Sequence, residues 1–294
     1  MVNWQEAKKF LNMFRQSFQQ ANGCDAWGKQ RFHLSDASSC TRKIWYRIML
    51  AKHPEMVDVW KFKDAPFDIE QMLNMEIGHG VHERFQDTLV NKMHWCTSDD
   101  IEVPIEYPTL NMKGSVDAII PVARLHEICR ELGIGPTIMP HMVGSHIILD
   151  FKTKRDDVTI ISKPGQPKKR EHSFPKKVIS YPDAGYFTQL QSYMNFIPEL
   201  YPERYPDVQL GILLYFCKND GRTLAIAVEK EPEVGIHVKE KAHAVLRYVE
   251  EKVAPPREHS RSEGCCKGWP AEDEDGYVSL KYGCPYYELC WRAG

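Results

Sequence analysis

The chain has 294 residues, 43% of them hydrophobic and 27% charged, which is ordinary for a globular protein and long enough to bury a sizeable core. Lysine and arginine total 38 against 40 for aspartate and glutamate, so the overall charge does not favour a polyanionic partner. No apolar run predicts a membrane span, and the first residues lack the pattern of a signal peptide, so we expect a cytoplasmic protein with no membrane partner.

Helices and strands are expected to alternate along most of the chain. The expected helices cover 3–20, 38–52 with Ser38 or Ser39 as the N-cap, 71–93, 123–133, 181–197 and 234–249. The expected strands cover 101–107, 114–122 and 145–154, followed by a hairpin of 208–216 and 223–229. This order predicts an α/β fold with a mixed central β-sheet flanked by helices.

Three consecutive segments are expected to make up the chain. They are an N-terminal helical region over 1–65, a core over 66–254 and a cysteine-bearing C-terminal tail over 255–294 that packs on the core. In the core, Ile77, Val81, Phe85 and Leu89 recur every four residues, so this helical stripe should face the interior.

The stretch "IILDFKTK", residues 147–154, places an acid and a lysine in an apolar strand. Because side chains alternate along a strand, Asp150 and Lys152 should share one face, with Phe151 pointing to the core on the other. A solvated strand end carrying an acid–lysine pair would also account for this tripeptide. A buried charge needs a partner, so the pair is also a candidate for chemistry.

A second acid, Asp117, lies in "GSVDAII", three residues after Gly114, which permits a close backbone approach. If its strand pairs with that of Asp150, two carboxylates converge and can bind a hard cation such as Mg²⁺. Asp117 alone would suit a strand end equally well.

Polar residues on two helices complete the candidate set. His82 lies one turn after Gly78, and its ordinary interpretation is a half-buried histidine. Gln189 and Tyr193 are four residues apart and share a helix face, which an ordinary polar helix edge would also produce.

Basic residues cluster after the central strand, where "KPGQPKKREHSFPKK" over 163–177 contains a single acid. Such a loop suits a phosphate backbone, and a solvated surface insertion is the alternative. The candidate nucleic-acid contacts are Lys154, Arg155, Lys168, Lys169, Arg170, Lys176 and Lys177.

Nine cysteines, four of them in the last thirty residues, argue against a disulfide framework and for metal or iron–sulfur ligation. The four clustered candidates are Cys265, Cys266, Cys284 and Cys290. A tetrahedral zinc site is the alternative to an iron–sulfur cluster.

In their order along the chain these motifs resemble the RecB-like branch of the PD-(D/E)xK nuclease superfamily. The matches are a helical His after Gly, a G-x-x-D strand, a D-x-K strand and a Q-x-x-x-Y helix. The cysteines resemble those of its iron–sulfur members, the CRISPR-associated adaptation nucleases and the nuclease half of bacterial AddB. The chain departs from their pattern where Lys281 stands in place of the third late cysteine, which leaves Cys265 or Cys266 for that role.

The resemblance implies a restriction-endonuclease-like core and a divalent-metal-dependent deoxyribonuclease. It implies that His82, Asp117, Asp150 and the Phe151 carbonyl hold Mg²⁺ or Mn²⁺, and that Lys152 orients or deprotonates the attacking water. Gln189 and Tyr193 would contact the phosphate or fix Lys152, and a [4Fe-4S] cluster would tie Cys40 to the tail. The implied activity is exonucleolytic on single-stranded DNA ends, 5′ to 3′, in recombination, repair or phage DNA processing.

Two other functions fit the residues. A non-catalytic adaptor could keep the nuclease fold and bind DNA ends, and a zinc-stabilised structural protein could carry these motifs by accident. No helicase phosphate loop occurs in the sequence, so a helicase or recombination protein that feeds the strand would be a separate chain.

Overall fold

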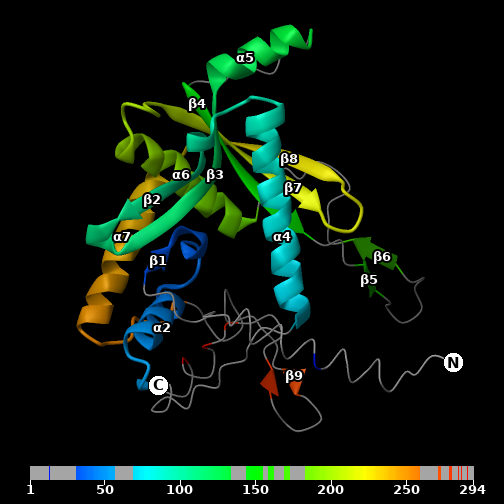
Figure 1. Cartoon of the computed structure of the whole chain (residues 1–294). Coiled ribbons are helices and arrows are strands. Elements are labelled where there is room, and N and C mark those ends of the chain that lie inside the picture. Colours follow the sequence, from blue (N-terminus) through cyan, green and yellow to red (C-terminus); the bar gives the residue numbers. More distant parts are fainter. Residues whose placement is uncertain are drawn as a thin grey trace, which may run out of the picture. The chain divides into compact units, whose positions relative to one another are not determined.

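The computed structural model describes the greater part of the chain (Figure 1). The described residues are 13, 31–56, 69–133, 144–154, 158–161, 169–172, 183–258, 271–272, 278–279, 284, 286 and 290. The helical region expected over 3–20 lies outside them except for Met13. No described helix has both the length and the apolar character needed to cross a membrane.

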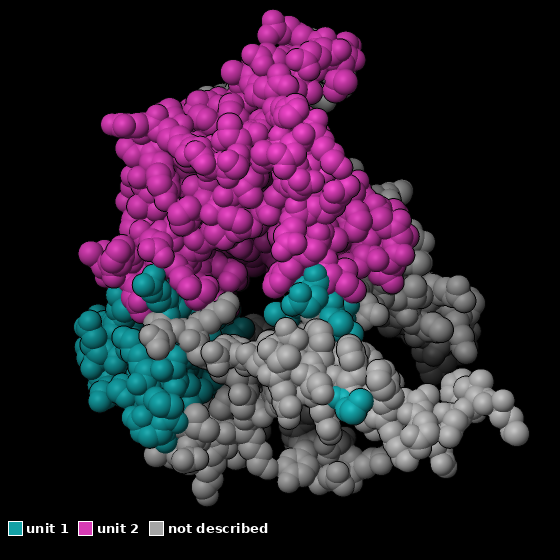
Figure 2. Space-filling model, viewed as in Figure 1, with its two compact units in different colours: residues 1–32, 39–76, 243–294 teal, residues 33–38, 77–242 magenta. Residues whose placement is uncertain are grey.

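Two compact units are assembled from segments that are distant in the sequence (Figure 2). Unit 1 comprises Met1–Phe32, Ser39–Glu76 and His243–Gly294, and unit 2 comprises His33–Ser38 and Ile77–Ala242. The division into 1–65, 66–254 and 255–294 stays a prediction.

Unit 2 is built on a six-stranded sheet in the order β1-β3-β4-β7-β8, with β2 also paired to β3. The strands are β1 (Phe32–His33), β2 (Ile101–Tyr107), β3 (Met112–Pro121), β4 (His146–Lys154), β7 (Val208–Cys217) and β8 (Thr223–Glu229). β3 is antiparallel to β2 and β4, β7 is antiparallel to β8, and β4 and β7 are parallel. The predicted mixed α/β class with a mixed, helix-flanked sheet is therefore confirmed.

Helices cover both faces of this sheet (Figure 1). A parallel pair needs a crossover, and α6 (Ala184–Leu200) lies between β4 and β7 in the chain. On the opposite face, Phe151 and Leu149 of β4 pack with Leu89 and Phe85 in one apolar cluster. As predicted, Phe151 points into a core, and only 2% of it is exposed.

The remaining helices follow the predicted positions with small differences. They are α2 (Thr41–Lys52), α4 (Ile69–Asp87), a π-helical turn (Thr88–Lys92), α5 (Val122–Glu131), α7 (Pro232–Glu250) and the 3-10 turns η1 (Leu34–Asp36), η3 (Ser98–Asp100) and η4 (Pro108–Leu110). Two further pairs of short antiparallel strands are β5 (Val158–Ile161) with β6 (Lys169–His172), and β9 (Ala271–Glu272) with β10 (Val278–Ser279).

Two local predictions are wrong. The N-cap of α2 is Cys40 rather than Ser38 or Ser39, and its sulfur accepts a hydrogen bond from the Lys43 amide at 3.4 Å. The predicted apolar stripe is buried only toward its end, because Leu89 of the π-helical turn is 5% exposed whereas Ile77 of α4 is 51% exposed. A four-residue spacing places side chains on one helix face but does not fix how far along the helix that face is covered.

The carboxylate of Asp100 ties the start of β2 to the turn after α6. Its Oδ2 accepts from the amide and hydroxyl of Thr97, and its Oδ1 accepts from Arg204 and the Tyr205 hydroxyl, both at 2.8 Å. Burial alone would raise the pKa of Asp100, but the hydrogen bonds from Thr97, Tyr205 and Arg204 outweigh it and hold the pKa below its ordinary value.

The substitution Asp100→Asn should therefore lower the free energy of unfolding by about 1–3 kcal/mol at neutral pH. A depressed carboxyl pKa stabilises the fold above the unfolded value of about 4, and this contribution disappears as pH falls through the folded pKa. Urea unfolding at several pH values should show the gap between variant and wild type closing below about pH 4. Asp99→Asn, at a neighbouring side chain that is 76% exposed, serves as the control; a gap that does not depend on pH would contradict the assignment.

Candidate functional site

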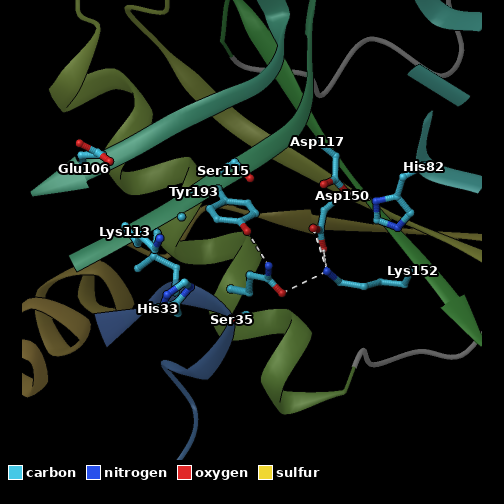
Figure 3. A pocket seen from close by; sticks show the side chains of 13 residues that line it. His33, Ser35, His82, Glu106, Lys113, Ser115, Asp117, Asp150, Lys152 and Tyr193 are labelled. Carbon is cyan, nitrogen blue, oxygen red and sulfur yellow. Dashed lines mark hydrogen bonds and ion pairs between the residues drawn. The ribbon is translucent and has the colours of Figure 1, made fainter. Parts of the chain in front are cut away.

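A cavity of about 470 Å³ in unit 2 collects the candidate side chains from four elements of the fold (Figure 3). Asp117 comes from β3, Asp150 and Lys152 come from β4, and the others come from α4 and α6. The candidate residues that line it are His82, Asp117, Asp150, Lys152, Gln189 and Tyr193. Side chains separated by as many as 111 positions in the sequence thus share one pocket.

Asp150 is a buried acid whose charge is balanced by its neighbour. Only 1% of the residue is exposed, and the ammonium of Lys152 lies 2.8 Å from each carboxylate oxygen. Only Oδ1 receives this ammonium in hydrogen-bond geometry, and among the described residues Oδ2 has no hydrogen-bond donor. Burial raises the pKa of Asp150 to about 6, against the opposing effect of the Lys152 charge.

Lys152 is held from two further directions. Its ammonium donates to the Gln189 side-chain oxygen at 3.0 Å and lies 4.9 Å from the ring centre of Tyr186. The Gln189 amide in turn donates to the hydroxyl of Tyr193, which fixes the orientation of that amide. Burial raises the pKa of Tyr193 well above its ordinary value, so this hydroxyl keeps its proton.

Asp117 lies where the sheet ladder is interrupted on both sides. The pairing of β3 with β2 runs from Ala118 to Ile101 and then from Val116 to Val103, so it skips Asp117 and Glu102. Glu102 adopts a φ of 50°, a left-handed conformation that is uncommon for a residue with a side chain. The pairing of β3 with β4 ends at Ala118 and Leu149, so the ladder stops just short of Asp117 and Asp150.

Other groups take up the hydrogen bonds that the ladder lacks at this point. The Phe151 amide donates to Oδ2 of Asp117 at 2.6 Å, and the side-chain amide of Gln86 donates to the Asp117 carbonyl at 3.1 Å. The carboxylate of Asp117 is thereby fixed in the pocket by the backbone of the strand that carries Asp150.

His82 reaches the same carboxylate from α4. Its Nδ1 lies 3.6 Å from Oδ2 of Asp117, and its ring packs edge-on against Phe151 at 5.7 Å between centres. Burial alone would lower the pKa of His82, but the hydrogen bond and charge of Asp117 outweigh it, so the pKa is raised.

The side chains of Asp117, Asp150 and His82 are of the chemical types that bind a hard divalent cation. Two carboxylates and an imidazole on one pocket are suitable ligands, and the ligands of such cations are predominantly oxygen. The described residues nevertheless contain no preassembled group of three or more His, Cys, Asp or Glu side chains around one point. The Lys152 ammonium instead occupies the cationic position beside Asp150, so a metal would have to share that carboxylate with Lys152 or displace it.

Five polar pocket residues were not among the candidates from the sequence. They are His33, Ser35, Glu106, Lys113 and Ser115. Lys113 and Ser115 precede Asp117 by four and two positions on one strand, so the alternation of side chains was a usable signal. His33 and Ser35 come from β1 and η1, and no local pattern in the sequence connects them with Asp117.

The predicted basic contacts lie largely beyond the described residues. Lys154 is half-buried on β4 with its ammonium 6.0 Å from the ring centre of Tyr215. Lys169 and Arg170 lie on β6, and only their backbone is described. The residues outside the described ranges are Arg155, Lys168, Lys176 and Lys177.

Three of the candidate cysteines are buried in unit 1 and form no disulfide. Arg42 donates to the sulfur of Cys290 at 3.5 Å, and Cys40 accepts the Lys43 amide. Within the same unit the ring of Tyr46 stacks on Tyr286 at 5.4 Å. Buried cysteine sulfurs are suitable ligands for a soft metal or an iron–sulfur cluster.

The described cysteines do not form a complete metal or cluster site by themselves. Cys40, Cys284 and Cys290 are not gathered around one point, and Cys265 and Cys266 lie outside the described residues. The choice between these last two for the remaining ligand stays a prediction.

Comparisons with known proteins leave the family open. No protein-family model matches the chain, and no curated protein matches it. One of the matching solved structures is described as "Crystal structure of SSO0001"; the match covers 74% of this chain and 75% of that chain with 15% identity and a TM-score of 0.39. A likeness at that level establishes neither a shared fold nor a shared activity.

The position of α6 depends on a close approach at Gly211 of β7. A Cβ built on Gly211 would come within 2.7–2.9 Å of the side chain of Leu190, which is fully buried beside Gln189. A methyl group there cannot be accommodated without moving the Leu190 side chain, α6 or the strand.

We therefore expect Gly211→Ala to lower the free energy of unfolding by about 1–3 kcal/mol, through overpacking against Leu190. Gly221→Ala is an unsuitable control because of its φ of 75°, whereas at Gly80 of α4 an added Cβ would meet nothing within 4 Å. Thermal unfolding of Gly211→Ala and Gly80→Ala should separate them, the second being near-neutral or stabilised. Equal stability of the two variants would contradict the close packing.

Proposed function

We propose that this chain is a divalent-metal-dependent deoxyribonuclease with a restriction-endonuclease-like core, of the RecB-like PD-(D/E)xK type. The proposal rests on one observation. A buried Asp–Lys pair on β4, the carboxylate of Asp117 on β3 and the imidazole of His82 line a single cavity together with Gln189 and Tyr193. Taken singly in the sequence, the acids could be strand ends, His82 a half-buried histidine, and Gln189 and Tyr193 a polar helix edge.

Each residue has a defined task in phosphodiester hydrolysis. Lys152, held by Gln189 and Tyr186, presents a fixed ammonium where negative charge develops on the phosphate during attack by water. The Phe151 amide and His82 fix the direction of the Asp117 carboxylate. In the overall step the attacking water gives up a proton as its oxygen bonds to phosphorus, the P–O bond to the leaving strand breaks, and the leaving oxygen takes up a proton.

The metal would be Mg²⁺ or Mn²⁺, held by His82, Asp117, Asp150 and the Phe151 carbonyl, and it would supply Lewis-acid activation of the phosphate and of the attacking water. Asp150 and Lys152 prepare this site while no cation is bound. The ammonium lets the buried carboxylate remain ionised in a place where an unpaired acid would be neutralised. The proposed substrate is a single-stranded DNA end, with cleavage from 5′ to 3′.

Substitution of each member of the buried pair should separate metal binding from catalysis. We expect Asp150→Asn to weaken Mn²⁺ binding and to lower cleavage by at least about a hundredfold. Lys152→Met should lower cleavage to a similar extent but bind Mn²⁺ more tightly than wild type, because the competing ammonium is gone. Calorimetry would measure Mn²⁺ binding, and end-labelled single- and double-stranded DNA would report cleavage and its polarity.

The controls are Asp99→Asn and Lys92→Met, two exposed positions of unit 2 outside the pocket. Both should keep wild-type cleavage and Mn²⁺ affinity. Full activity in Asp150→Asn and Lys152→Met would end the proposal. A wild-type protein that binds DNA ends but cleaves none with either metal would instead be the non-catalytic adaptor.

We also propose that Cys40, Cys284 and Cys290, with Cys265 or Cys266, hold a [4Fe-4S] cluster. The buried sulfurs of unit 1 and the N–H donors beside two of them support it. Its role would be to fix the tail within unit 1, since the ligands come from both ends of the chain.

Protein purified without oxygen should be brown and contain iron and acid-labile sulfide. Cys284→Ser and Cys290→Ser should lose most of both, whereas Cys129→Ser, a half-exposed position on α5 of unit 2, should keep them. Iron and sulfide content, with the visible absorbance spectrum, measures this. A colourless protein with one bound zinc would favour the zinc alternative, and one without either metal would exclude both.

A further inference from the structure

The cavity extends beyond the residues that the proposed chemistry uses. Lys113 and His33 line it away from Lys152, and Figure 3 draws these two side chains on the opposite side of the view from Lys152. Ser115 and Asp117 also line the cavity. The pocket therefore has a second end, defined here by Lys113 and His33 and also lined by Glu106, that no proposed step requires.

The alternation of side chains along β3 sets the distance between the two ends. Lys113, Ser115 and Asp117 occupy every second position, so they project from one face of the strand. Four residues at the rise of a strand separate the Cα atoms of Lys113 and Asp117 by roughly 13 Å. A single phosphate group cannot span that distance, so a ligand that contacts both ends must offer a second acceptor.

Lys113 has no acidic partner among the described residues. Its Cα partner across the ladder is Glu106 of β2. Glu106 is exposed, whereas Lys113 is half-buried. By contrast, Lys152 has Asp150, and Lys239 of the same unit has Glu199.

A half-buried ammonium without a protein acceptor favours an anionic ligand, because burial removes part of its hydration and gives nothing in return. In a pocket whose other end handles a phosphodiester, the matching anion is another phosphate of the same strand. The cavity volume of about 470 Å³ is within the range for small-ligand sites.

We propose that Lys113, with His33 beside it, binds a phosphate of the substrate strand other than the one that is cleaved. The inference rests on the proposed nuclease function and narrows its substrate to a strand that carries at least one phosphate in addition to the scissile one. That phosphate is either the terminal one or the next internal one, and both present the same chemistry to Lys113.

The test is a series of fluorescent single-stranded oligothymidylates, each with one phosphate replaced by an uncharged methylphosphonate. Anisotropy in EDTA gives the affinity of the wild type for each member. We expect one position, besides the scissile phosphate, at which neutralisation lowers wild-type affinity about tenfold. Lys113→Ala should bind the unmodified strand about tenfold more weakly than the wild type does. In this variant, neutralising the phosphate at the same position should no longer change the affinity.

Matched variants show whether charge or shape is responsible. Lys113→Arg should restore most of the affinity, and Lys92→Ala should behave as wild type. Lys113→Ala should also reduce the slope of log affinity against log salt by about 0.7, the loss of one single-strand phosphate contact. Glu106→Gln should tighten binding, because it removes a negative charge that lines the same pocket as Lys113.

The position at which neutralisation no longer matters in Lys113→Ala shows whether Lys113 binds the terminal phosphate or the next internal one. If Lys113 binds the 5′-terminal phosphate, the wild type should bind an oligonucleotide with a 5′ phosphate more tightly than one with a 5′ hydroxyl. Lys113→Ala should bind these two oligonucleotides with equal affinity. An internal position should leave both ends equivalent. An unchanged methylphosphonate profile in Lys113→Ala overturns the proposal, as does weaker binding in Glu106→Gln, which would indicate a cationic ligand.

Failure of this inference is separable from failure of the nuclease proposal. A wild type that cleaves DNA, loses cleavage in Asp150→Asn and shows no effect of Lys113→Ala keeps the nuclease and removes the second phosphate site. A wild type that binds strands through Lys113 but cleaves none keeps the phosphate site alone. A wild type that neither binds nor cleaves removes both.

Discussion

The buried carboxylate of Asp150 is the constraint on which the rest of the site depends. An acid that is 1% exposed loses nearly all its hydration, and this burial raises the pKa of Asp150 to about 6 even beside the Lys152 ammonium. The ammonium of Lys152 offsets this cost from the same strand face. Lys152 must then be held in turn, and α6 provides Gln189 and Tyr186 for that purpose. One buried charge thus determines what the facing helix must carry.

The same constraint explains why two glycines accompany the site. Gln189 reaches Lys152 only if α6 lies close to the sheet, and Gly211 of β7 gives the space that Leu190 occupies. On the other edge, a Cβ on Gly114 would come within 2.9 Å of Leu34, so the backbone of β3 can pack against η1 and admit His33 and Ser35 to the pocket. Gly114 was expected to permit a close approach, and the approaching group is a side chain of η1.

Most of the fold and part of the site could be predicted from the sequence, because both depend on short-range periodicity. Alternation along β4 placed Asp150 and Lys152 together and Phe151 in the core. The i, i+4 relation joined Gln189 to Tyr193. Contacts between different helices and strands were harder to predict from the sequence. Nothing local predicts that Tyr186 lies over Lys152, because this contact joins two elements. The Cys40 cap of α2 is a local contact with the Lys43 amide, but the serine prediction followed the usual N-cap preference, which does not include cysteine.

The interruption of the ladder at Asp117 shows why sequence patterns stop short of function here. A regular strand would pair the backbone of Asp117 with β2 and β4 and leave its carboxylate to solvent. Instead Glu102 takes a left-handed conformation, Gln86 binds the Asp117 carbonyl, and the Phe151 amide turns to the carboxylate. Residues on each side of the gap still alternate, so Lys113 and Ser115 share the face of Asp117. The break thus fixes one acid rigidly at the chemical end of the pocket, while the intact part of β3 carries the same face on toward Lys113.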